Sequence, residues 1–200
     1  MPDNNSPEDD WRTLQPNAEH AIRTLLSKVV SHESPLELFE AYVYAKEVAA
    51  RAVWARMEMH LPAENSTFRA LHAKIHEKLQ MEYGGVVPAK LLKVPYGGRT
   101  HERLFTLLQE KIGQAVPAEI LRITTQDAVH TERRTRELRE LGLDVVWYER
   151  DEVRVYELRN LELNLSRLPA IVRNNIRKDQ YLTENEKKEF LRKSGIPENG

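Results

Sequence analysis

The sequence predicts a mainly helical protein that contains one small β-hairpin. Apolar residues recur every three or four positions through most of the chain, which is the spacing of one face of an α-helix. Residues 144–149 and 153–159 instead alternate apolar and polar side chains and are rich in valine, as is typical of paired strands. Residues 84–98 hold two Gly-Gly pairs and two prolines, so they mark the best internal boundary.

Composition excludes several classes of protein. The 200 residues include 30 Lys and Arg against 31 Asp and Glu, which excludes a uniformly basic nucleic-acid coat protein. No cysteine is present, which excludes disulfides, thiolate zinc sites, iron–sulfur clusters and cysteine nucleophiles. No apolar run approaches the roughly 18 residues of a membrane helix, and the first residues are acidic, unlike a targeting leader. We expect a cytoplasmic protein without membrane contact.

The first part of the chain predicts a helical bundle. Residues 1–16 are acidic and hold almost nothing apolar before Trp11, so we expect a disordered tail. Helical spacing then predicts three helices, which begin near Asn17, Ser34 and Ser66 and together form a bundle over residues 17–83. Residues 84–98 are expected to be the linker that follows it.

The second part predicts a winged helix-turn-helix over residues 99–159. A helix ends at Gly113, Val116-Pro117 opens a short helix, and an arginine-rich helix spans 128–141. The two strands follow, joined by the turn at 150–152. Three helices and then a hairpin is the element order of a winged helix-turn-helix. Residues 160–200 form a basic helical arm, whose last helix begins with the capping-box spacing Thr183-x-x-Glu186.

The arginine-rich helix has two distinct sides. Helical spacing turns one side towards the core of the small domain, and that side holds Ala128, Thr131, Thr135, Leu138 and Leu141. The other side presents guanidinium groups, which match phosphates and the O6/N7 edge of guanine. Candidate DNA-binding residues are Gln126 and His130 near base edges, Arg133, Arg134 and Arg136 on the helix, Arg150 and Arg154 on the wing, and Arg173, Arg177 and Lys178 on the arm.

Charge alone leaves other interpretations open. Residues 99–159 carry 11 basic and 12 acidic side chains, a balance that opposes tight nonspecific DNA binding. A helix rich in Arg and Glu is often a solvated face. Winged helices also serve as protein-docking modules.

A family resemblance supports the DNA-binding interpretation. The segments Val116-Pro-Ala-Glu-Ile-Leu and Arg133-Arg-Thr-Arg-Glu-Leu-Arg-Glu-Leu-Gly resemble the winged-helix module that accompanies HNH nuclease domains in bacterial restriction endonucleases. The likeness covers roughly residues 99–159, and Leu168–Asp179 resembles the basic helix that leads into the HNH module. It implies sequence- or modification-specific binding of double-stranded DNA. The expected Cys- and His-bearing nuclease segment has no counterpart before Gly200, so nuclease activity does not carry over.

Two rival functions remain. The chain could be a restriction endonuclease in its own right with a divergent site for a divalent metal such as Mg²⁺, or a winged-helix transcriptional regulator that forms a homodimer through the helical bundle. His72 and His76 share one helical face at metal-ligand spacing. No third ligand can be assigned, so we predict no metal site and no cofactor for DNA binding itself.

Overall fold

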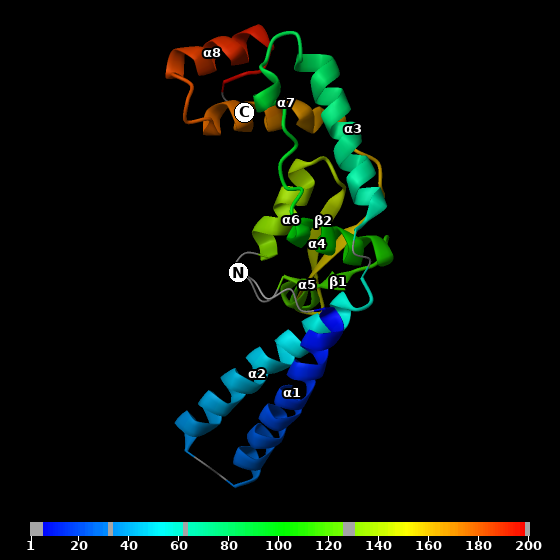
Figure 1. Cartoon of the computed structure of the whole chain (residues 1–200), viewed down its shortest axis with the longest axis vertical. Coiled ribbons are helices and arrows are strands. Elements are labelled where there is room, and N and C mark those ends of the chain that lie inside the picture. The colour runs from blue at the N-terminus through cyan, green and yellow to red at the C-terminus, as the bar shows by residue number, and fades with distance from the viewer. Residues whose placement is uncertain (1–5, 32–33, 62–63, 126–130, 199–200) are drawn as a thin grey trace. The chain divides into compact units, whose positions relative to one another are not determined.

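The computed structural model describes residues 6–31, 34–61, 64–125 and 131–198. This part of the chain is mainly helical and carries one small antiparallel sheet (Figure 1). The helices are α1 (Pro7–Val30), α2 (Pro35–Glu58), α3 (Ser66–Tyr83), α4 (Arg99–Glu110), α5 (Ala118–Thr124), α6 (Thr131–Glu140), α7 (Leu168–Lys178) and α8 (Glu184–Lys193). The strands are β1 (Val116–Pro117), β2 (Val145–Arg150) and β3 (Val153–Leu158), and two 3₁₀ turns are η1 (Ala89–Leu91) and η2 (Leu165–Arg167).

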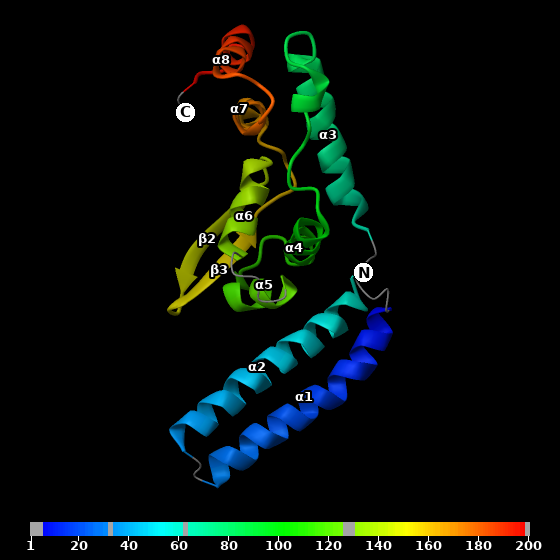
Figure 2. The same cartoon turned by 60° about the vertical axis from the view of Figure 1, so that its left-hand side comes forward.

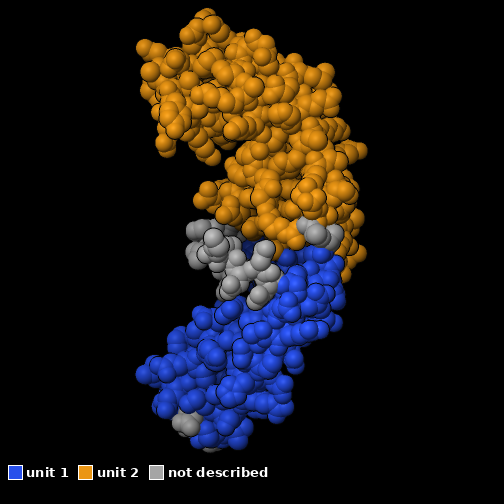
Figure 3. Space-filling view, viewed as in Figure 1, with its two compact units in different colours: residues 1–63, 119–129 blue, residues 64–118, 130–200 orange. Residues whose placement is uncertain are grey.

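The contacts divide the chain into two compact units (Figure 3). Unit 1 comprises Met1–Ala63 and Glu119–Val129, and unit 2 comprises Glu64–Ala118 and His130–Gly200. The sequence instead predicted a boundary at residues 84–98. Each unit is described by itself below.

In unit 1, α1 and α2 pack side by side as an antiparallel hairpin (Figures 1 and 2). The Ser6 side chain caps α1 by accepting a hydrogen bond of 3.2 Å from the Asp9 backbone N–H. Acidic residues in the first turn of α1 stabilise the helix, because their negative charges interact favourably with the positive end of the helix dipole. The prediction of a disordered tail over residues 1–16 is therefore wrong from Pro7 onward.

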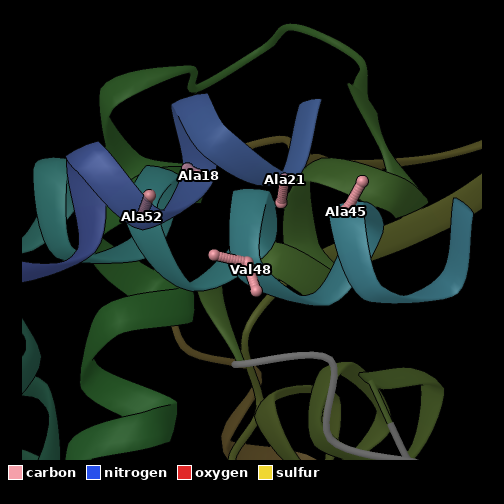
Figure 4. Packing of buried hydrophobic residues seen from close by; sticks show 5 residues of the cluster. All are labelled: Ala18, Ala21, Ala45, Val48 and Ala52. Carbon is pink, nitrogen blue, oxygen red and sulfur yellow. The ribbon is translucent and has the colours of Figure 1, made fainter. Parts of the chain in front are cut away.

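Small side chains line the contact between the two helices of this hairpin. The buried cluster consists of Ala18, Ala21, Ala45, Val48 and Ala52 (Figure 4). Alanine lets two helix backbones approach closely, but each contact buries little apolar area. The hairpin consequently keeps its small residues inside and many of its large apolar residues outside.

Helix α3 belongs to unit 2, which contradicts the predicted three-helix bundle over 17–83. Its cap Asn65 is buried and fixes the start of α3 on α4. The Asn65 backbone N–H donates to Glu102 Oε1 at 2.6 Å, and its side-chain amide donates to Thr106 Oγ1 at 3.0 Å. These buried polar contacts explain why α3 packs with α4.

Residues 84–98 are packed rather than a free linker. Leu91 and Leu92 are buried, and η1 lies against α7. The Asn175 side-chain amide donates to the carbonyl oxygens of Leu91 at 2.9 Å and Lys93 at 2.8 Å. The segment is therefore an integral part of unit 2.

The sheet has the strand order β1-β3-β2, and both pairings are antiparallel. The predicted hairpin is confirmed, with Asp151 and Glu152 at φ 51° and 64° in its turn, the backbone that two-residue hairpin turns use. The short helix predicted at Val116-Pro117 is present as α5, but it begins only at Ala118, because Val116 pairs with Tyr156 as strand β1.

Gly142 ends α6 and turns the chain towards β2. Its φ is 94°, and a Cβ at this position would lie 2.8 Å from the Asn164 carbonyl oxygen. The Asn164 N–H in turn donates to the Gly142 carbonyl oxygen at 2.8 Å. Only glycine combines this backbone with this close approach.

Candidate nucleic-acid interface

Helix α6 is anchored through the side that the sequence predicted. Thr135 and Leu138 are fully buried, and Leu141 just beyond the helix is also buried. Ala128 lies outside the described residues, as does the side-chain environment of Thr131. The helix packs along β2 (Figure 2) and against α4, which leaves its other side for cationic groups.

Glu137 is a buried carboxylate on this helix, only 3% exposed. His101 on α4 places Nε2 2.7 Å from Glu137 Oε2. Two neighbouring arginines complete the cluster, since Arg133 Nε donates to Oε1 at 2.9 Å and an Arg134 guanidinium nitrogen donates to Oε2 at 2.9 Å. Both carboxylate oxygens are thus paired with donors.

The protonation states in this cluster follow from its geometry. Burial would raise the pKa of Glu137, but the hydrogen bonds from His101, Arg134 and Arg133 outweigh it and hold the pKa below its usual range. Burial lowers the pKa of His101, although Glu137 opposes that shift. At neutral pH a neutral His101 therefore donates its Nε2–H to an ionised Glu137.

This pairing changes the role of two predicted DNA contacts. Arg133 and Arg134 keep side chains that are 57% and 38% exposed, yet both neutralise Glu137. Either arginine would have to leave a buried carboxylate to bind a phosphate fully, which carries a desolvation penalty. The main role of Arg133 and Arg134 is therefore to hold α6 in place through Glu137. Only the solvent-exposed parts of their side chains remain available to a ligand.

A hollow of about 470 Å³ lies between α6 and the sheet. We call it the arginine groove, and it is lined by Glu132, Arg133, Arg136, Arg139, Trp147, Arg154 and Tyr156. Trp147 and Tyr156 are register partners on β2 and β3. The Arg154 guanidinium lies 5.0 Å from the Trp147 ring centre in a cation–π arrangement, and Trp147 is half exposed. The groove therefore combines four cations with an accessible aromatic face.

The same positive surface continues into a second hollow of about 330 Å³ between α6 and α7. This α6–α7 pocket is lined by Pro95, Tyr96, Arg136, Arg139, Glu140, Arg167, Ala170, Ile171, Asn174, Asn175 and Lys178. Arg136 and Arg139 line both hollows. Glu140 is engaged, because it accepts a hydrogen bond of 2.6 Å from the Tyr96 hydroxyl and lies 3.7 Å from Arg136.

Three cationic side chains on this surface differ from the paired arginines. Arg139, Arg167 and Lys178 form no ion pair with any acidic side chain that the structure describes. Arg154 contacts an aromatic ring rather than a carboxylate. These four side chains are the ones most ready to accept an anionic ligand.

The other predicted residues have mixed positions. Arg150 is at the hairpin turn, 3.8 Å from the exposed carboxylate of Asp151. Lys178 lines the α6–α7 pocket, whereas Arg177 donates to the backbone oxygen of Glu198 and the Nε atom of Arg173 is buried without a described partner. Gln126 and His130 lie outside the described residues.

The sequence analysis did not select Arg139, Trp147 or Arg167. Arg139 lies three residues after Arg136, so helical spacing could have placed both on one surface. Trp147 alternates outward on its strand, a signal that was present in the hairpin pattern. Arg167 belongs to η2, and no local pattern predicts that this turn faces α6.

No family model, curated protein or solved structure matches this chain. Among the described residues, no helix is both long and apolar enough to cross a membrane. That part of the chain also holds no group of three or more His, Cys, Asp or Glu side chains arranged to bind a metal ion.

Proposed function

We propose that unit 2 binds double-stranded DNA through the arginine groove and the α6–α7 pocket. The observation that carries this proposal is the lining of the groove, where four arginines and one glutamate surround an exposed tryptophan. Phosphate contacts supply most of the affinity of DNA-binding proteins, and guanidinium groups suit both phosphates and the guanine edge.

The order of elements supports a winged-helix mode of binding. The chain runs α4, β1, α5, α6, β2, β3, and β1 pairs with β3 at the edge of the sheet. In this mode α6 is the recognition helix in the major groove, and the β2–β3 turn with Arg150 is the wing near the backbone. Gln126 and His130, which precede α6, remain predicted base contacts.

The resemblance to the recognition modules of restriction endonucleases supports a more specific role. We propose that the chain recognises a DNA sequence or a base modification as the recognition part of a restriction-endonuclease-like protein. The charge balance of the domain fits this role, because a protein with few free cations depends less on nonspecific phosphate attraction. The principal contacts are Arg136, Arg139, Arg154, Arg167 and Lys178.

The test measures binding of labelled duplexes by fluorescence anisotropy. Arg139→Ala and Arg154→Ala are each expected to weaken binding about 5- to 100-fold, the range for loss of one good charged contact. Arg51→Ala removes an exposed arginine from α2 and is the matched control, which should bind like the parent chain. Equal effects of all three substitutions, or no binding by the parent chain at modest salt, would contradict the proposal.

The same experiment separates recognition from cleavage. Methylated and unmethylated plasmids are incubated with the protein in Mg²⁺ or in EDTA, and shifts and cuts are analysed on parallel gels. A methylation- or sequence-dependent shift without cutting is the expected result. Discrete Mg²⁺-dependent fragments would instead make the chain a nuclease.

A further inference from the structure

We propose that a hollow at the free edge of β2 binds one unpaired nucleotide whose base carries an amino group. The hollow has a volume of about 620 Å³, within the range of roughly 300–1,000 Å³ that is typical of small-molecule sites. We call it the edge hollow. It is lined by residues 142–147, by four residues of the segment 160–164 that follows β3, and by Arg139 and Arg167. All of these residues belong to unit 2.

The edge hollow follows the side of β2 that no other strand covers. β2 is an outer strand of the sheet, and its inner neighbour is β3. Successive side chains of a strand point to opposite faces, so a hollow that touches residues 144–147 in a row lies along the edge. The Arg159 N–H donates to the Asp144 carbonyl oxygen, which fixes the alternation of the ladder. The backbone N–H and C=O of Trp147 therefore point away from β3 and are available to a ligand.

The edge hollow holds charged side chains of both signs that do not pair with one another. Arg139 and Arg167 form no ion pair with any described acidic side chain, and Asp144 and Glu162 form none with any described basic side chain. A ligand that fills the space between them must present an anion to the arginines and a hydrogen-bond donor to the carboxylates. A nucleotide does both, through its phosphate and through the exocyclic amino group of its base.

Asp144 is held in position for a contact with the base. The Asn160 side-chain amide donates to Asp144 Oδ2 at 3.1 Å, and Asn160 Oδ1 accepts from the Glu162 backbone N–H at 2.9 Å. Asp144 Oδ1 accepts no hydrogen bond from the part of the chain that the structure describes. Carboxylates accept from the N4 amino group of cytosine, whereas thymine carries a carbonyl oxygen at that position. The free carboxylate oxygen therefore favours cytosine over thymine.

Trp147 and Arg139 connect the edge hollow with the arginine groove, because both residues line both hollows. The Trp147 side chain is half exposed, and aromatic rings of this kind stack on bases without regard to sequence. A nucleotide that rotates out of a duplex bound in the arginine groove is one source of the ligand, and this source rests on the proposed function. A free mononucleotide has the same chemistry and is the other source.

The first arm of the test measures binding of deoxycytidine and thymidine monophosphates to the 200-residue chain by isothermal titration calorimetry. The cytidine nucleotide should bind about 5- to 100-fold more tightly, the range for one good contact to a base edge. Asp144→Asn still accepts from Asn160 but turns an amide N–H towards the ligand, so the preference should disappear or reverse. Glu149→Gln lies on the same strand outside the edge hollow and is the matched control.

The second arm measures binding of labelled duplexes by fluorescence anisotropy. One duplex is fully paired, one carries a single unpaired cytosine and one carries a single unpaired thymine. The parent chain should bind the duplex with the unpaired cytosine at least about 5-fold more tightly than the duplex with the unpaired thymine. Asp144→Asn should lose this difference and keep the parental affinity for the paired duplex. Circular dichroism verifies the helix content of both variants.

The two arms distinguish the sources of the nucleotide and separate this inference from the proposed function. A cytosine preference in the duplexes assigns the edge hollow to DNA, and one confined to the mononucleotides assigns it to a free nucleotide. Duplex binding without a cytosine preference in either arm overturns the inference and leaves the proposed function intact. A preference for the cytidine nucleotide without any duplex binding does the reverse. A preference that persists in Asp144→Asn, or that Glu149→Gln removes equally, also overturns the inference.

Discussion

The two units place their large and small apolar side chains in opposite ways. Unit 2 buries residues such as Phe105, Leu104 and Ile176 and carries arginines on the surface next to them. The hairpin of unit 1 buries alanine and exposes Phe39 and Leu26. Unit 2 therefore has a core of large side chains, whereas the contact between α1 and α2 depends on small ones. The difference predicts that unit 2 loses stability when a large buried side chain is truncated, and that unit 1 loses stability when a small one is enlarged.

Truncation of the core of unit 2 should have the largest effect. Phe105 is fully buried and packs with Phe68 at a ring-centre distance of 5.1 Å. Phe105→Ala should lower the free energy of unfolding by about 3–5 kcal/mol, through lost burial and the cavity left behind. Denaturant titration measures this change in the free energy of unfolding, and Tyr44→Ala on the hairpin is the control. A loss below about 1 kcal/mol would show that unit 2 lacks a tight core.

Enlargement of the alanine contact tests the opposite property of unit 1. Ala45→Leu should destabilise the hairpin by about 1–3 kcal/mol, because the close helix approach has no room for a larger side chain. Glu47→Leu adds a leucine at an exposed position of the same helix and should change stability far less. Thermal unfolding followed by circular dichroism compares them. If Ala45→Leu is neutral or stabilising, α1 and α2 are not closely packed.

Removal of the charge on Glu137 tests the anchor of α6. Glu137→Gln keeps the shape of the side chain but loses two charge-assisted hydrogen bonds, so stability should fall by about 1–2 kcal/mol after allowance for the partly exposed arginines. Arg133 and Arg134 then become available, and the affinity for DNA should rise. A variant with parental stability and unchanged DNA affinity would contradict the role assigned to this carboxylate.

Acidification should produce the smallest effect, and it acts through two histidines of unit 2. Burial lowers the pKa of His72 and of His101 below the usual value of 6.5. The unfolded chain binds these protons as pH falls through 6.5, while the folded protein binds them only at lower pH. Stability is therefore complete above pH 6.5 and is lost below it, by up to about 1.4 kcal/mol for each unit by which a pKa is lowered.

Denaturant titrations at pH 7 and pH 5 measure this loss. Glu137 does not contribute in this range, because its pKa lies below the usual value and it stays ionised. His72→Asn should reduce the loss, whereas His76→Asn, at an exposed position one turn later, should leave it unchanged. An identical pH dependence in both variants would exclude His72 as a source.

Local patterns predicted much of the fold. Helices α2, α3 and α8 begin near Ser34, near Ser66 and after Thr183 as expected, and the two-strand hairpin is confirmed. The early start of α1 was missed because the acidic residues after Ser6 were interpreted as disorder rather than as a favourable first turn. Local patterns do not state which partner a helix packs against, so the separation of α3 from α1 and α2 was not predictable.

The candidate site was only partly predictable for the same reason. The face of α6 that holds Thr135 and Leu138 followed from spacing alone. The pairing of Arg133 and Arg134 with Glu137 also fits helical spacing, but its strength depends on burial by α4 and on His101, which are distant in sequence. Arg167 and Lys178 join the surface only through tertiary packing.

The most direct test of DNA binding by unit 2 is the salt dependence of the affinity for a duplex. Each phosphate contact should contribute about one to the slope of log K against log salt concentration. The triple variant Arg139→Ala, Arg154→Ala, Lys178→Ala should therefore have a weaker salt dependence, with a slope about three smaller in magnitude than that of the parent chain. Arg51→Ala should leave the slope unchanged. An unchanged slope in the triple variant would show that the arginine groove and the α6–α7 pocket do not bind the DNA backbone.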